Sequence, residues 1–290
     1  SGFYFDGRRL DCPDGSLRRD DARGRERPAL PFSLAWRAGD GFLDFSLRDV
    51  DAVAFSPLVK RLRGWRPQGR IDLALRAEGG RATLDLSVRE LAFASREGEV
   101  AGKGIAFTLA AVAEQAAGGW HWRARFDWPE GEFFRAPWRR NAGVRMEAEG
   151  SLTRDILDVV LARLEVAGTG AVTAGLRWDR ERGEATDWGF ITERIGLEAA
   201  MRDWIQPWLS SLGFPEWRAS GHARFSAEWI AGGLRRFYAG LEEARLADGT
   251  GHIELDGVNA RIPWEEGVPT EAEIGVAAGR LRVKPGQQPI

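Results

Sequence analysis

The sequence predicts an all-β, mainly antiparallel protein: a long curled sheet built from two copies of a repeat, with one or two short amphipathic helices. Apolar and polar residues alternate through most of the chain, as they do in strands that bury one face. Turn signals rich in glycine separate these segments at the spacing of hairpins. Internal similarity at an offset of roughly 150 residues indicates repeated modules, which usually build an elongated body.

The internal similarity divides the chain into two predicted copies, residues 1–155 and 156–290. The offset drifts by a few residues, as small loop insertions would make it do. We expect the two copies to form one continuous sheet and the second to be cut off at the C-terminus. The aligned pairs are Pro57 with Pro207, Gly69 with Gly221, Glu90 with Glu243, Gly98 with Gly251, Gly104 with Gly257, and Gly131 with Gly279.

Alternating segments mark the expected strands in chain order. Turn signals such as Gly79-Gly80 and Gly118-Gly119 lie between them. In the first copy the segments are 32–36, 43–47, 71–75, 84–88, 105–109, 120–128 and 144–146. In the second they are 159–161, 172–178, 225–229, 253–255, 262–264, 274–276 and 281–283.

Two segments break the strand period and predict helices. Near residues 197–212 the apolar residues draw one stripe on a helix, and Pro207 inside it predicts a kink or two short helices. A shorter counterpart is expected near 56–65, with Ser56 as the N-cap and Pro57 as the first helical residue. The stripe consists of Leu197, Met201, Trp204, Ile205, Trp208, Leu209 and Leu212.

The balance of charges excludes a broad class of functions. The 41 Lys and Arg against 43 Asp and Glu give a net charge of −2, so the chain lacks the basic field of a nucleic-acid binder. The single cysteine, Cys12, rules out an internal disulfide. No stretch approaches the roughly 18 apolar residues of a membrane span. We expect a segment of a longer protein whose membrane anchor lies outside this sequence.

Catalytic and metal-binding signatures are missing from the sequence. The three histidines, His121, His222 and His252, are far apart and show no metal-ligand spacing. Cys12 has no nearby base and is interpreted as inert. We therefore predict no enzyme activity, no metal and no cofactor.

Carboxylate pairs beside tryptophans allow a different interpretation. Asp127 and Glu130 flank Trp128-Pro129, and Glu265-Glu266 follow Trp264, as the carboxylates and sugar platform of a glycosidase would. Such turns follow nearly every strand, so solvated turn charges are the favoured interpretation.

The apolar face of so many one-sided strands needs a cover. Two short helices are too few to provide it. Two packed sheets, a closed barrel, or a curled sheet whose inner face binds a hydrophobic ligand would each solve the problem, and the residues alone do not choose among them.

The strongest local charge cluster lies on the first predicted helix. Cationic side chains on one side and an indole on the other suit contact with an anionic membrane surface. The alternative is a solvated helix face that packs its leucines and tryptophan on the sheet. The residues of this possible membrane-facing basic helix are Lys60, Arg61, Arg63, Trp65 and Arg66.

Two long passages, GRIDLALRAEGGRATLDLSVRELAFAS and SGHARFSAEWIAGGLRRFYAGLEEARLADGTGHIELDGVNARIPW, resemble the AsmA-like proteins of Gram-negative cell envelopes, in particular their large inner-membrane-anchored members. The resemblance covers most of the chain and rests on repeat rhythm. It implies a periplasmic repeating β-groove that carries phospholipid between the inner and outer membranes in outer-membrane biogenesis. It also implies an inner-membrane anchor and membrane proteins as partners at the ends of the groove.

If the resemblance holds, a phospholipid or another acyl-chain lipid is the expected partner, and the wall of the groove comes from the most regular strands. The alternatives are a structural or protein-interaction module with a closed β core, or a carbohydrate-binding β protein that uses its tryptophans. The candidate wall residues are Leu73, Leu75, Leu84, Leu86, Val88, Ile105, Phe107, Phe225, Trp229, Ile253 and Leu255.

Overall fold

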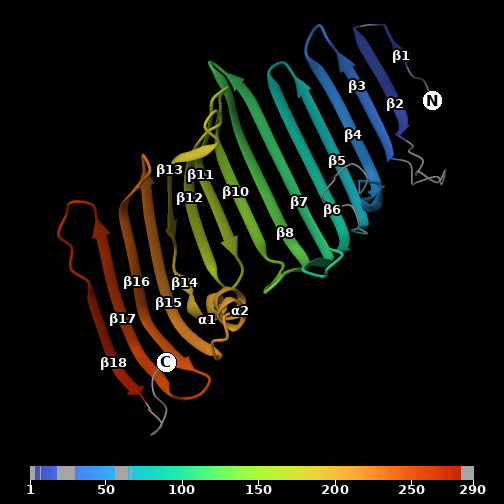
Figure 1. The fold of residues 1–290 in the computed structure, drawn as a ribbon. Coiled ribbons are helices and arrows are strands. Elements are labelled where there is room, and N and C mark those ends of the chain that lie inside the picture. Colours follow the sequence, from blue (N-terminus) through green and yellow to red (C-terminus); the bar gives the residue numbers. More distant parts are fainter. Residues whose placement is uncertain (1–3, 7, 18–29, 56–64, 66, 282–290) are drawn as a thin grey trace. The chain divides into compact units, whose positions relative to one another are not determined.

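The computed structural model describes residues 4–6, 8–17, 30–55, 65 and 67–281 (Figure 1). Its internal contacts divide the chain into unit 1, Ser1–Arg154, and unit 2, Asp155–Ile290. Every pairing between strands is antiparallel, and the few helical residues stand in short turns. The predicted all-β antiparallel class is therefore confirmed.

Unit 1 is a meander in which each strand pairs with the next as far as β8. β8 then pairs with β9 along one part of its edge and with β10 along another. A 3₁₀ turn, η1 (Ala52–Phe55), follows β4. The strands are β1 (Tyr4–Phe5), β2 (Arg9–Leu17), β3 (Leu30–Arg37), β4 (Phe42–Asp51), β5 (Gln68–Glu78), β6 (Arg81–Ala94), β7 (Val100–Ala116), β8 (Gly119–Arg135), β9 (Trp138–Asn141) and β10 (Val144–Leu152).

Unit 2 is a second meander with a helical segment between β14 and β15. Both β13 and β14 pair with β15, so the helical segment leaves the sheet and returns to it. The strands are β11 (Ile156–Val166), β12 (Gly170–Asp179), β13 (Glu184–Thr192), β14 (Ile195–Gly196), β15 (Trp217–Ile230), β16 (Gly233–Asp248), β17 (Ile253–Glu265) and β18 (Glu273–Leu281).

The predicted helix near 197–212 is confirmed as a broken one. α1 (Leu197–Ala200) leads into a π-helical turn, η3 (Met201–Ile205), and then into α2 (Gln206–Ser211). Pro207 stands in the first turn of α2, directly after the π-helical turn, and its missing N–H interrupts the backbone hydrogen bonds of the helical segment there. The other predicted helix, near 56–65, lies outside the described residues except for Trp65.

A β-bulge occupies the same aligned position in each unit. The β5–β6 register shifts at Gly69, and the β15–β16 register shifts at Gly221. Opposite them, Glu90 and Glu243 have φ of 52° and 49°. A Cβ on Gly69 would lie 2.8 Å from the carbonyl oxygen of Arg89, and one on Gly221 would lie 2.5 Å from that of Glu243. Glycine is therefore required at both places.

The next strand pair has matching registers in the two units. Gly104 and Gly257 both have φ of 60°. Gly131 and Gly279 are not equivalent, since Gly131 approaches the backbone of Gly104 whereas Gly279 pairs with Leu255. The matching partners are Val88–Phe107 and Leu241–Ala260, Leu91–Ile105 and Ala244–Val258, and Phe93–Gly102 and Leu246–Leu255.

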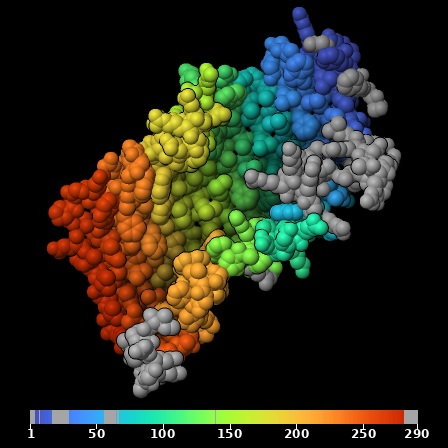
Figure 2. All heavy atoms as spheres, in the orientation of Figure 1, coloured from blue at the N-terminus to red at the C-terminus, as the bar shows by residue number. Residues whose placement is uncertain are grey.

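The buried core of each unit gathers beside these bulges. In unit 1, Leu47 and Val50 flank the β4 bulge and contact Phe55 of η1. In unit 2, Leu197 of α1 packs against Ala223 and Ala244, which flank the β15–β16 bulge. The space-filling view shows the helical segment at one end of the strands of unit 2 (Figure 2). The helical turns therefore cover only the bulged end of each sheet.

Replacing Gly221 with alanine should destabilise unit 2. The new Cβ would meet backbone atoms at 2.5–2.9 Å and would hold a φ of 93°. We expect the free energy of unfolding in urea to fall by at least about 2 kcal/mol. Gly275→Ala in β18 is the matched control, because a Cβ there meets nothing within 4 Å. Equal stability of the two variants would contradict the steric role of Gly221.

Candidate functional site

One face of the unit 1 sheet is apolar across its whole width. Because side chains alternate between the faces of a strand, residues paired in register share a face. The opposite face carries a row with serines, Asp85, Arg125 and Glu147. Two cross-strand rows of the apolar face are Leu34, Phe45, Leu75, Leu84, Ala111, Ala124 and Ala148, and Leu47, Leu73, Leu86, Leu109, Phe126 and Met146.

Unit 2 has an apolar face of the same kind that is richer in aromatic rings. The opposite face carries Asp158, Arg177 and Asp187 in one row. The two apolar rows are Val159, Leu176, Trp188, Trp229 and Leu234, and Ala162, Ala174, Phe190, Ala227, Phe237 and Trp264.

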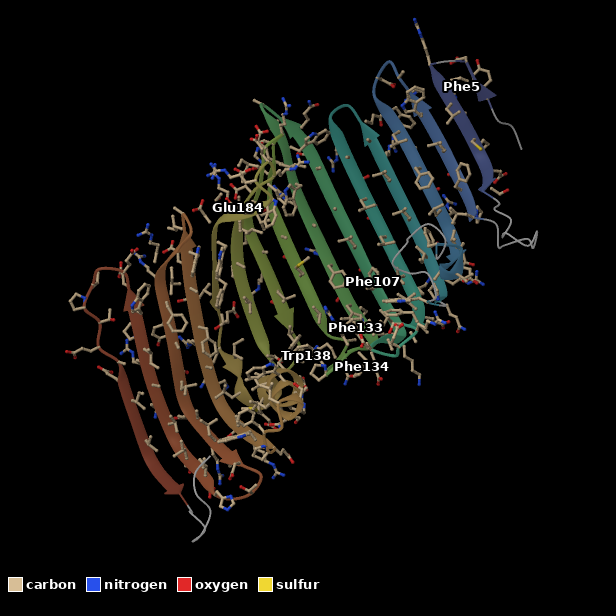
Figure 3. All side chains as sticks on the ribbon, viewed as in Figure 1. Phe5, Phe107, Phe133, Phe134, Trp138 and Glu184 are labelled. Atoms are coloured by element: carbon tan, nitrogen blue, oxygen red, sulfur yellow. The ribbon has the colours of Figure 1, made fainter. Side chains whose placement is uncertain are left out.

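All the predicted wall residues lie on the apolar face of their own unit. Val88 and Ile105, beside the bulges, are 4% and 7% exposed. Phe225 is 36% exposed, and the other candidates are half-buried, including Phe107 on β7 (Figure 3). The structure thus assembles the candidates into two surfaces, one in each unit, that remain open to water away from the bulges.

Among the described residues, only η1, Trp65 and the α1–α2 segment cover these faces. Val50 is the one large side chain among them that is less than 2% exposed. Much of each apolar face is therefore left uncovered by the described residues.

The predicted basic helix is described only at its last aromatic residue. Lys60, Arg61, Arg63 and Arg66 lie outside the described residues. The ring of Trp65 stacks on that of Phe93, with centroids 5.3 Å apart and planes 12° apart. Phe93 in turn contacts Phe133, so Trp65 joins an aromatic cluster of unit 1 (Figure 3).

The polar faces are covered by exposed ion pairs. On β8 and β10, Arg125 pairs with Glu147 at 2.9 Å and Arg145 with Asp127 at 3.4 Å. On unit 2, the hydrogen bond from Arg163 lowers the pKa of Glu193. Exposed pairs of this kind add little stability, but they keep this face solvated.

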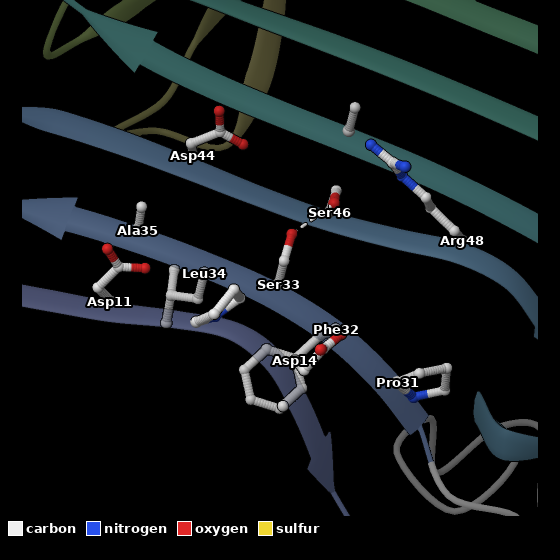
Figure 4. Close-up of a pocket in the computed structure, with 13 residues that line it drawn as sticks. Asp11, Asp14, Pro31, Phe32, Ser33, Leu34, Ala35, Asp44, Ser46 and Arg48 are labelled. Carbon is white, nitrogen blue, oxygen red and sulfur yellow. Dashed lines mark hydrogen bonds between the residues drawn. The ribbon is translucent and has the colours of Figure 1, made fainter. Parts of the chain in front are cut away.

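A depression of about 610 Å³ lies on the polar side of β2–β4 (Figure 4). Its walls carry Asp11, Asp44 and Arg48, and its floor is crossed by a 2.7 Å hydrogen bond between the Ser33 and Ser46 hydroxyls. No cluster of three or more metal-ligating side chains occurs anywhere in the described residues. The depression suits water or a small polar molecule, and it brings no reactive groups together.

Three of the carboxylates that the sequence offered for glycoside chemistry form ion pairs with arginines. Asp127 pairs with Arg145, Glu265 with Arg236 at 3.2 Å, and Glu266 with Arg235. The indole N–H of Trp128 donates to the carbonyl oxygen of Glu130 at 2.7 Å. Asp127, Trp128 and Glu130 lie inside β8, so the turn predicted for them was wrong, whereas Glu265 ends β17 and Glu266 follows it.

His252 belongs to a polar network in the β16–β17 turn. The carboxylate of Asp248 accepts hydrogen bonds from the amides of His252 and Ile253 at 2.8 and 2.9 Å and from the Thr250 hydroxyl. These bonds, with that from the Ile253 amide the largest cause, hold the pKa of Asp248 below its usual value of 3.8. The Asp248 side chain is 6% exposed, so the network shapes the turn.

Comparison with protein-family models, curated proteins and solved structures finds no match to this chain. None of the described helices has the length and apolar character of a membrane span.

The contribution of Asp248 should depend on pH. Its folded-state pKa is lowered, so its stabilisation is complete above the unfolded-state pKa and is lost as pH falls through the folded value. The difference in unfolding free energy between wild type and Asp248→Ala should be full at about pH 6 and shrink steadily below 3.8. A difference that stays constant down to about pH 2 would contradict the role of the carboxylate charge.

Proposed function

We propose that this chain is a non-catalytic periplasmic segment that holds phospholipid acyl chains in a hydrophobic β-groove for transport between the inner and outer membranes. The observation that carries the proposal is the apolar, half-exposed face of each unit. The resemblance of the sequence to AsmA-like proteins supports a phospholipid as the ligand of this face. An inner-membrane anchor in the full-length protein and membrane-protein partners at the groove ends belong to the same proposal.

The groove requires that the two units be copies of one repeat and that the sheet curl. The aligned bulges at Gly69 and Gly221 and the matching β6–β7 and β16–β17 registers support a common origin. Bulges bend a strand and increase its twist. A line of them at one level of each sheet favours curvature, and on the concave side an apolar face becomes a groove.

The energetics favour a lipid as the occupant. Removing several hundred Å² of apolar area from water is worth on the order of 10 kcal/mol at about 25 cal/mol per Å², before ordering costs. Soluble monomers rarely leave contiguous apolar patches larger than a few hundred Å². Acyl chains need no polar recognition, and the described apolar faces offer very little of it.

The half-exposed face also separates this proposal from its rivals. A protein-interaction module with a closed core would bury Leu84, Leu86 and Phe107, which are half-buried instead. A carbohydrate platform would need polar side chains beside its tryptophans, but the register partners of Trp178, Trp188, Trp229 and Trp264 are apolar. Lipid remains the occupant that fits both faces.

A charge placed on each apolar face should expel bound lipid. We expect Leu84→Glu combined with Phe225→Glu to lower co-purified phospholipid by at least about tenfold, because burying a carboxylate costs several kcal/mol. Phospholipid per mole of protein is measured by extraction and mass spectrometry.

The matched control introduces the same charges on the polar faces of the same strands, as Thr83→Glu with Ser226→Glu. It should retain the lipid. A folded wild type that carries no lipid, or equal loss in both variants, would refute the proposed groove.

A further inference from the structure

Four tryptophans gather at the open end of the unit 2 face, opposite the helical segment. Trp178, Trp229 and Trp264 are the penultimate residues of β12, β15 and β17. Trp188 of β13 lies beside Trp229 in register. All four belong to the apolar face, and we call them the aromatic rim.

Rings of the aromatic rim stack on their neighbours and remain partly exposed to water. The rings of Trp188 and Trp229 are parallel within 8°, with centroids 5.8 Å apart, and Trp188 also stacks on Phe190. Trp178 and Trp188 are each 36% exposed, and Trp264 is 40% exposed. None of the four indole N–H groups donates a hydrogen bond within the described part of the chain. Each of these indole N–H groups can therefore donate a hydrogen bond to a polar ligand atom or to water.

The opposite end of the same face is closed. Leu197 of α1 packs on Ala223 and Ala244 there, with Met201 of η3 beside it. Along β15, six residues separate Trp229 from Ala223, which is about 20 Å at 3.3 Å per residue. One leaflet of a bilayer has about 15 Å of hydrocarbon. The strip between the rim and the helical segment therefore matches the length of an acyl chain.

Charged turns lie immediately beyond the rim. The β12–β13 turn, which ends at Glu184 (Figure 3), holds Arg182 between Asp179 and Glu184 at 3.8 and 3.9 Å. Arg235, near the start of β16, pairs with Glu266 in the β17–β18 turn. From the helical segment outward, the apolar strip, the aromatic rim and the charged turns follow one another in the same order as the acyl chains, the interface and the headgroups of a bilayer leaflet.

Unit 1 shows the same order on its own face. Trp36 is the penultimate residue of β3, and Trp120 and Trp122 begin β8. All three lie at the strand ends away from η1 and the bulges. The β3–β4 turn beyond Trp36 holds an ion pair of Arg37 with Asp40 at 3.3 Å.

We infer that the aromatic rim binds the glycerol and headgroup region of a diacyl phospholipid, which lies along the strands of unit 2 with its chain ends toward α1. This inference rests on the proposed function and deepens it. The indole N–H groups meet the ester and phosphate oxygens, and the acyl chains cover Phe225, Phe237 and Ile262 between the rim and the helical segment.

The test uses the full chain loaded with phosphatidylcholine that carries a diazirine beside the glycerol or at the last carbon of one chain. After irradiation, crosslinks are mapped by mass spectrometry. In unit 2 the glycerol-proximal probe should label the peptides of Trp188, Trp229 and Trp264. The chain-end probe should label Phe225 and the α1–η3 segment instead.

A rim variant, Trp188→Leu with Trp229→Leu, should lose at least about half of the glycerol-proximal labelling, since it removes two of the four indole N–H donors. Its fold is checked by circular dichroism and urea midpoint, and chain-end labelling should persist. Labels in the reverse order, or spread evenly over the strands, would overturn the inference while leaving the groove intact. Crosslinks from neither probe would overturn the proposed function itself.

Discussion

The constraint that governs this structure is a shortage of cover for its apolar surface. Each strand presents one apolar face, yet the described residues offer only η1, Trp65 and the α1–α2 segment as a second layer. An ordinary domain closes such a face with another sheet or with helices. Here the buried side chains gather at the bulged end, and Val50 is the largest of those that are fully enclosed among the described residues. The rest of the face has no cover among the described residues.

The bulges explain why the cover lies where it does. At two of them the positive-φ residue is held by a specific contact: in the β4 bulge the Asp72 carboxylate accepts the Asp49 amide at 2.8 Å, and opposite Gly221 the Asn259 side chain accepts the Glu243 amide at 3.0 Å. A non-glycine residue at positive φ costs about 1 kcal/mol or more. The buried residues on which the helical turns pack stand beside these bulges in both units. The position of the cover therefore follows from one local feature.

Sequence reasoning reached most of the strands and the helix at 197–212 because both depend on local period. It missed β2, β9, β13 and β16. The first two contain Pro13 and the polar run from Arg139 to Asn141, which interrupt the alternation. The prediction that Val159 and Leu161 share a face was wrong, since a register shift before Ala162 leaves Leu161 42% exposed. Three tryptophans of the aromatic rim had a readable signal, a position one residue before the end of a strand, but its meaning required knowing which ends lie together.

Under the proposed function, a rim of several similar tryptophans reconciles holding a lipid with moving it. Trp178, Trp188 and Trp229 stand on strands that are successive neighbours in the sheet, and Trp264 lies two strands beyond. Neighbouring strands are about 4.8 Å apart, so on the proposed path a headgroup moves between the first three indoles in short steps and crosses two strand spacings to reach Trp264. No single contact would then dominate the affinity. Such a wall would permit transport without conformational change, which an enclosed pocket with one strong polar anchor would not.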